Sequence, residues 1–160
     1  MTTNPLTTLM QHKQWIDAAF YDVAGSVEVA SKPELQREVL YWLSHIHIVD
    51  QIFFAHLTGK THAFTSTVSD DIPELDELRG NSTALNGALV ELASSMSNQA
   101  AQEVIEFVFT DGMLGAMTRQ QMLMHLSTHG LYHLSVTGTH LIKAGVAMPP
   151  VLLTTMLHRH

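Results

Sequence analysis

Apolar residues return every three or four positions along most of the chain, the spacing typical of amphipathic helices. The first predicted helix begins at Asn4 and Pro5 and extends to about Ala30, because Asn caps free amides and Pro fits the first turn. The second begins at residues 31–34, which have the form of a capping box with Pro in the first turn, and it ends at Gly59.

Two further helices follow a long connection. Residues 60–71 are polar and without period, and they predict the longest loop. The third helix opens at Pro73 and Glu74, with a kink expected near Gly80 and Asn81. The fourth begins after a Thr-x-x-Gln capping box at residues 118–121 and continues to residues 143–144.

The segment 103–117 breaks this pattern. It is rich in β-branched and aromatic residues and leads into Asp111 and Gly112, which predicts a short hairpin. Gly145 then ends the fourth helix in a left-handed conformation, and residues 151–157 predict a last short helix. Four long helices with one small β excursion predict an all-α fold, most simply a four-helix bundle. The alternative is an irregular all-α domain whose helices cross at steeper angles.

Composition narrows the class of protein. The chain has 160 residues, of which 46% are hydrophobic and 14% are charged, so we expect one folded domain spanning residues 1–160. Eight Lys and Arg residues against fifteen Asp and Glu residues give a net charge of -7. No basic cluster is present, which argues against a nucleic-acid partner.

The sequence also lacks cysteine, which excludes disulfides and thiolate metal sites. A transition metal must then be held by His, Asp or Glu. The first residues do not resemble a signal peptide, and no apolar run approaches the roughly 20 residues of a membrane span, so we expect a cytoplasmic protein without membrane contact. The end at residues 158–160 is interpreted as a frayed polar terminus in preference to a metal-binding tail.

Histidines form a stripe along the fourth predicted helix. His125, His129 and His133 are four residues apart, so they climb one face of the helix, and His140 falls in the same arc. A pair of imidazoles four residues apart suits two adjacent positions around Zn²⁺, Ni²⁺ or Fe²⁺. Two overlapping pairs are available here, and spacing alone does not choose between them.

A third ligand must come from another helix, and the second predicted helix offers candidates. His45 and His56 share one flank of that helix, whereas His47 is about 200° away from His45 around the axis. Three imidazoles would leave coordination positions open for water or substrate, as in catalytic sites. The competing interpretation is that these histidines are hydrogen-bonded packing residues. Four neighbouring methionines, more simply core filler than soft-metal ligands, are Met113, Met117, Met122 and Met124.

At these residues the sequence resembles the DinB-like (DinB/YfiT) family of metal-binding four-helix bundles. Residues 43–59 are similar to the family's Leu-Asn-His-x4-Asp-Arg-Ile-Trp-Leu segment closed by Gly, and residues 123–133 are similar to its Leu-His-x3-His-x3-His segment. The resemblance covers nearly the whole chain. It implies an up-down-down-up bundle with a metal triad at His45, His129 and His133.

The resemblance also bears on the neighbouring residues. It makes His125 a neighbour of the site, and it matches Asp50, for which we expect a hydrogen bond between helices and not ligation. Family members commonly follow the last ligand with Arg-Gly, but here Leu134 and Ser135 stand at that place. Any family activity that needs this Arg is therefore in doubt for this chain.

Two functions follow from the resemblance. Some relatives are metal-dependent transferases or isomerases that use thiols such as bacillithiol or mycothiol, which implies an enzyme that activates a thiol or water at one bound ion. His125 or Tyr132 would then be candidate proton donors, although packing roles are the simpler interpretation for both. The alternative is a metal-binding or stress-associated protein without turnover. A homodimer formed through an apolar helix face is expected.

Overall fold

The computed structural model describes residues 4–158 and is mostly helical. Its long helices are α1 (Pro5–Ala24), α3 (Pro33–Leu57), α4 (Leu75–Ser95) and α6 (Arg119–Lys143). The short elements are the helices α2 (Val27–Ala30), α5 (Asn98–Ala101) and α7 (Leu153–Leu157) and the strands β1 (Val104–Val108) and β2 (Leu114–Thr118). The predicted polar terminus at residues 158–160 lies mostly outside the described residues, which end at His158.

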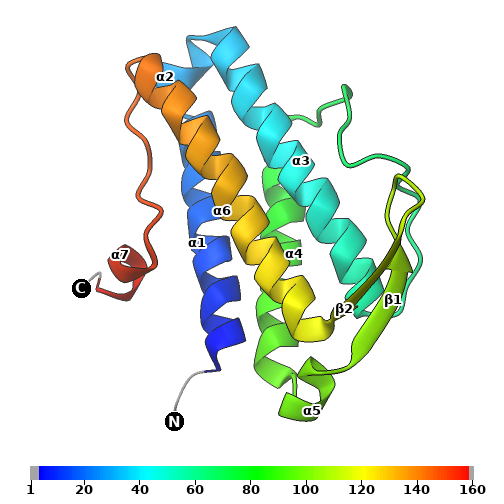
Figure 1. The fold of residues 1–160 in the computed structure, drawn as a ribbon. Coiled ribbons are helices and arrows are strands. Elements are labelled where there is room, and N and C mark those ends of the chain that lie inside the picture. Colours follow the sequence, from blue (N-terminus) through cyan, green and yellow to red (C-terminus); the bar gives the residue numbers. More distant parts are fainter. Residues whose placement is uncertain (1–3, 159–160) are drawn as a thin grey trace.

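The four long helices lie side by side (Figure 1). α1 packs against α4 and α6, and α3 packs against α6. The contact between α3 and α4 is less extensive, and the loop of residues 58–74 that joins them runs along the outside of the molecule (Figure 1). This arrangement places the second and the last long helix, which carry the candidate ligands, next to each other.

The core consists of two apolar clusters along the helices. One contains Met10, Phe53, Leu89, Met122 and Leu126 among others. The other contains Ile16, Phe20, Leu43, Leu78, Leu134 and Leu141 among others. Along α1 and α4, Lys13 and Asn86 fall between the residues of the two clusters and are themselves buried. A buried polar layer therefore interrupts the core.

The expected hairpin is confirmed. β1 and β2 pair antiparallel from Val104 opposite Thr118 to Val108 opposite Leu114, and Gly112 adopts a positive φ of 87° in the turn. Thr118 then caps α6 in a capping box, because its hydroxyl accepts from the Gln121 amide and the Gln121 side chain accepts from the Thr118 amide. This cap fixes where the histidine-bearing helix begins.

Two predictions about helix ends were wrong. The first helix ends at Ala24 and not near Ala30, since Ser26 accepts a hydrogen bond from the Val29 amide and starts the separate helix α2. Ser31 does not cap α3, because its hydroxyl donates to the Glu28 carbonyl and Lys32 occupies the N-cap without a side-chain bond.

The third helix also differs from its prediction. α4 begins at Leu75 and runs without interruption past Gly80, where a kink was expected. The helical hydrogen bonds tolerate a Gly at modest cost, so a Gly alone does not break a helix. Among the described residues, no helix combines the length and apolar character that crossing a bilayer requires.

Candidate metal centre

Three imidazoles from two neighbouring helices converge at the contact between α3 and α6. His129 and His133 lie one turn apart on α6 and face His45 of α3. The Nε2 atom of His45 lies 3.1 Å from Nε2 of His129 and 3.3 Å from Nε2 of His133. One nitrogen from each of the three residues lies within 4.8 Å of the others.

These distances fit ligation of a single ion. Two imidazole nitrogens bound at about 2.0–2.1 Å in tetrahedral geometry lie about 3.3 Å apart. The spacing from His45 to each of the other two histidines agrees with this value. A set of three imidazoles suits Zn²⁺, Ni²⁺ or Fe²⁺ and does not select one of them. The group could therefore hold a divalent transition metal.

A backbone carbonyl orients the ligand on α3. Nδ1 of His45 lies 2.7 Å from the carbonyl oxygen of Thr67, in the loop between α3 and α4. A carbonyl only accepts, so this hydrogen bond requires the proton on Nδ1 and leaves the Nε2 lone pair free. Metal-binding histidines are commonly oriented by such a partner on the second ring nitrogen.

Burial keeps the two ligands on α6 neutral. Burial is the largest cause, and repulsion from a positive His133 or His45 ring adds to it; together they lower the pKa of His129 to about 3. The pKa of His133 is lowered by the same two causes, burial and then His45. Neutral imidazoles have the lone pair that a metal needs, so near neutral pH these two ligands can bind without first releasing protons.

Aromatic packing encloses one side of the site. The ring of Trp42 stacks on His133 with centroids 4.9 Å apart and meets His45 edge-on at 5.8 Å. Nδ1 of His129 is buried and has no hydrogen-bond partner among the described residues. Trp42 therefore restricts the rings of two of the three histidines.

The other histidines of the stripe and of α3 have different surroundings. His125 packs its ring near Phe53 and His129, with centroids 4.9 Å and 5.4 Å away, and does not join the triad. His140 pairs with Glu38. His56 packs on Phe107, with ring centroids 4.9 Å apart, and His47 is buried on another face of α3. The structure thus brings together His45, His129 and His133, keeps His125 beside His129 but outside the group, and places the other histidines elsewhere.

A buried charged layer lies next to the triad, and the roles of Lys13 and Asp17 in it were not predicted from the sequence. Lys13 of α1 is fully buried, with Nζ 2.6 Å from Oδ2 of Asp17 and 2.6 Å from Oδ2 of Asp50. The contact with Asp50 confirms the hydrogen bond expected between helices. A Cβ placed at Gly130 would lie 3.8 Å from the Lys13 ammonium, so this charge sits against the turn of α6 that bears His129.

The electrostatics of this layer are set by burial and by the two carboxylates. Burial alone would lower the pKa of Lys13, but the attraction of Asp17 and Asp50 outweighs it and raises the pKa. Burial raises the pKa of Asp50 to about 7, while Lys13 opposes this rise. Asn86 of α4 completes the layer by donating to Asp17 over 2.9 Å. The signal in the sequence was the position of Lys13, one helical step from both Met10 and Ile16 on the apolar stripe of α1.

Comparison with known proteins agrees with this arrangement. The model of the DinB family matches residues 1–159. No curated protein and no solved structure matches the chain. The family match covers nearly the whole sequence, and the three-histidine group is present. The chain belongs to the DinB family.

Proposed function

We propose that this DinB-family protein binds one divalent transition metal ion through His45, His129 and His133. The observation that carries the proposal is the approach of three Nε2 atoms from two helices at the spacing of ligands around one ion. Without an ion, Nε2 of a neutral His45 ring with its proton on Nδ1 can only accept a hydrogen bond in these two contacts, whereas an ion would use one lone pair from each of the three rings. The hydrogen bond from His45 to Thr67 and the stacking of Trp42 on His133 hold these two imidazole rings in the orientation that metal binding needs.

The activity we propose is transfer or hydrolysis with a low-molecular-weight thiol or water as the nucleophile. Three protein ligands leave room in the coordination sphere for a small molecule. A bound ion acts there as a Lewis acid that lowers the pKa of a thiol or water. The chain contributes the orientation of the three imidazoles, and Trp42 shields one side from water.

A proton donor near the site would come from the neighbouring residues. His125 is a candidate, because its ring lies 5.4 Å from that of His129. Burial lowers its pKa, so near neutral pH its ring would first accept a proton and then donate it. Tyr132 is a weaker candidate, since its ring contacts His133 at 5.1 Å but is 65% exposed. We therefore assign His125 the supporting role if the reaction needs one.

The architecture we propose around this site is a four-helix bundle of the up-down-down-up type. The course of the chain in Figure 1 supports it: α1 and α6 run one way, while α3 and α4 run the other. Two consecutive helices that run in the same direction need a long connection, and residues 58–74 provide one along the outside of the molecule.

A second candidate is a metal-binding protein without turnover that acts as a homodimer. One observation favours it: α6 exposes large apolar side chains on its outer side. Those that share this side of the helix are Met124, Tyr132, Val136 and Ile142. Light scattering of the purified chain tests the dimer, and a monomer at all concentrations would remove this candidate's support.

The catalytic proposal is tested with Co²⁺ as a spectroscopic substitute for the native ion. Addition of glutathione or cysteine to the Co²⁺-loaded protein is expected to produce a thiolate-to-cobalt charge-transfer band. The His133→Ala variant serves as the control and should give no band. An unchanged cobalt spectrum on thiol addition would contradict thiol activation while leaving metal binding itself intact.

A further inference from the structure

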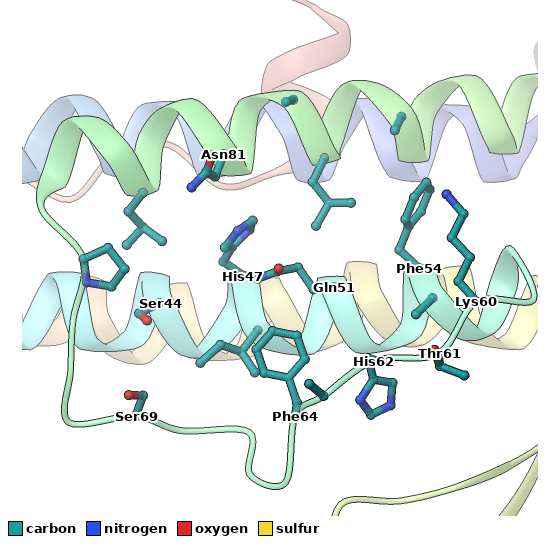
Figure 2. Close-up of a pocket in the computed structure, with 18 of the residues that line it drawn as sticks. Ser44, His47, Gln51, Phe54, Lys60, Thr61, His62, Phe64, Ser69 and Asn81 are labelled. Atoms are coloured by element: carbon teal, nitrogen blue, oxygen red, sulfur yellow. The ribbon is translucent and has the colours of Figure 1, made fainter.

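A second concave site lies on the opposite side of α3 from the triad. It is a cavity of about 880 Å³ between α3, α4 and the loop that joins them (Figure 2). None of the three candidate metal ligands lines it. Its walls are largely apolar and include Ile48, Phe54, Phe64, Leu78 and Leu85. The volume and the apolar lining are those of sites that bind small organic molecules.

A buried and unpartnered imidazole points into this cavity. His47 is 8% exposed, and its Nδ1 atom has no hydrogen-bond partner among the described residues. In Figure 2 its ring projects from α3 into the space between α3 and α4. A buried ring nitrogen without a partner is costly, because it has given up its bonds to water. A bound molecule with a hydrogen-bond donor would restore that bond.

Other polar side chains of the lining are free as well. Among residues 4–158, the side chains of Gln51, Asn81 and Lys60 take part in no hydrogen bond or ion pair. Lys60 and Phe54 lie together at one end of the cavity in Figure 2, and Ser69 lies toward the other end. Ser69 is already used, since its hydroxyl donates to the Asp71 carbonyl and accepts from the Asp71 amide. The unpaired positive charge is thus at the Lys60 end.

We propose that this cavity binds a small organic anion with an apolar, ring-sized body. The body packs between the apolar side chains of α3 and α4. The anionic group lies at Lys60, and a donor group on the body bonds to Nδ1 of His47. The site is separate from the metal triad, so this proposal stands or falls independently of metal binding.

The test uses two fluorescent probes of the proposed shape with the metal-free protein. Anilinonaphthalene sulfonate is anionic, and N-phenylnaphthylamine is its neutral counterpart; both have one amine N–H. Both are expected to bind with enhanced emission. Ala84→Trp places a large ring in the cavity from α4 and is expected to weaken both by about tenfold or more. Thr83→Trp, on the same helix but outside the lining, is the matched control and should bind both like the parent.

Two further variants separate the parts of the proposal. Lys60→Met is expected to weaken only the anionic probe, by about twofold to fivefold, as for an exposed ion pair. His47→Phe keeps the ring volume and is expected to weaken both probes by about threefold to tenfold, the effect of one lost hydrogen bond. Circular dichroism verifies that each variant is folded.

The outcomes that overturn the proposal are specific. Equal binding of both probes to Ala84→Trp and the parent would show that they bind elsewhere on the surface. Equal effects of Lys60→Met on the anionic and the neutral probe would remove the anion from the proposed ligand class. Unchanged binding to His47→Phe would remove the role of its Nδ1 atom.

Discussion

His45 donates its Nδ1 proton to the backbone carbonyl of Thr67 across 2.7 Å, so in the neutral ring it is the unprotonated Nε2 that faces His129 and His133. The loop that follows α3 thus folds back to orient a ligand on the same helix. A lone pair held in place by the backbone does not have to be ordered when an ion arrives. This contact links the long loop, which has no regular structure of its own, to the candidate metal centre.

The first prediction concerns this proton. In the metal-free protein at mildly alkaline pH, nitrogen NMR of the imidazole rings should show Nδ1 of His45 protonated and Nε2 unprotonated. The exposed His158, whose Nδ1 atom also lies near a backbone carbonyl, at 2.8 Å, provides a reference for a weakly held ring. A proton on Nε2 of His45 would contradict the orientation described here.

The two tryptophans report on the site differently. The Trp42 ring stacks on His133 at 4.9 Å, whereas Trp15 stacks on His12 at 6.0 Å. Ni²⁺ is therefore expected to quench the fluorescence of Trp15→Phe, which retains Trp42, much more than that of Trp42→Phe. Equal quenching of the two variants in a titration would place the ion away from His133.

The buried charged layer makes Lys13 important for stability. Lys13→Met should lower the free energy of unfolding by about 3–5 kcal/mol, because it leaves the carboxylates of Asp17 and Asp50 buried without their partner. Lys32→Met removes an exposed lysine and should cost less than about 0.5 kcal/mol. Urea unfolding compares the two, and similar small costs would mean that the layer does not hold the helices together.

Asp50 predicts a pH dependence of stability. Folding raises its pKa from 3.8 to about 7, so between these values the folded state holds a proton that the unfolded state has lost. The contribution of Asp50 to the free energy of unfolding is complete below about pH 4 and is lost as the pH rises through 7. Relative to Asp50→Asn, the free energy of unfolding of the parent should therefore fall by about 2–4 kcal/mol between these pH values. A parallel pH dependence of the two proteins in urea unfolding would contradict this assignment.

Local patterns in the sequence predicted most of the fold. The capping box at Thr118 and the turn at Gly112 are formed by neighbouring residues, so the sequence contained the whole interaction. The cap at Ser31 was predicted wrongly because its hydroxyl had a competing local partner, the Glu28 carbonyl. Residue propensities for helix caps do not show which of two possible local hydrogen bonds a side chain forms.

Less of the candidate site than of the fold could be predicted from the sequence. Helical spacing placed His125, His129 and His133 on one face but could not choose a pair, since the choice depends on how α6 lies against α3. The resemblance to the family selected the three residues that the structure brings together. The role of Thr67 could not be predicted, because its contact is made by a backbone carbonyl in a loop without period.

The central claim is tested most directly by the metal content of the protein purified without chelator and without a polyhistidine tag. The account predicts about one divalent transition ion per chain in the parent and its loss in His45→Ala, His129→Ala and His133→Ala. The controls His56→Ala, His125→Ala and His140→Ala should keep the ion, because these residues lie outside the triad. A full complement of metal in His45→Ala would contradict the account.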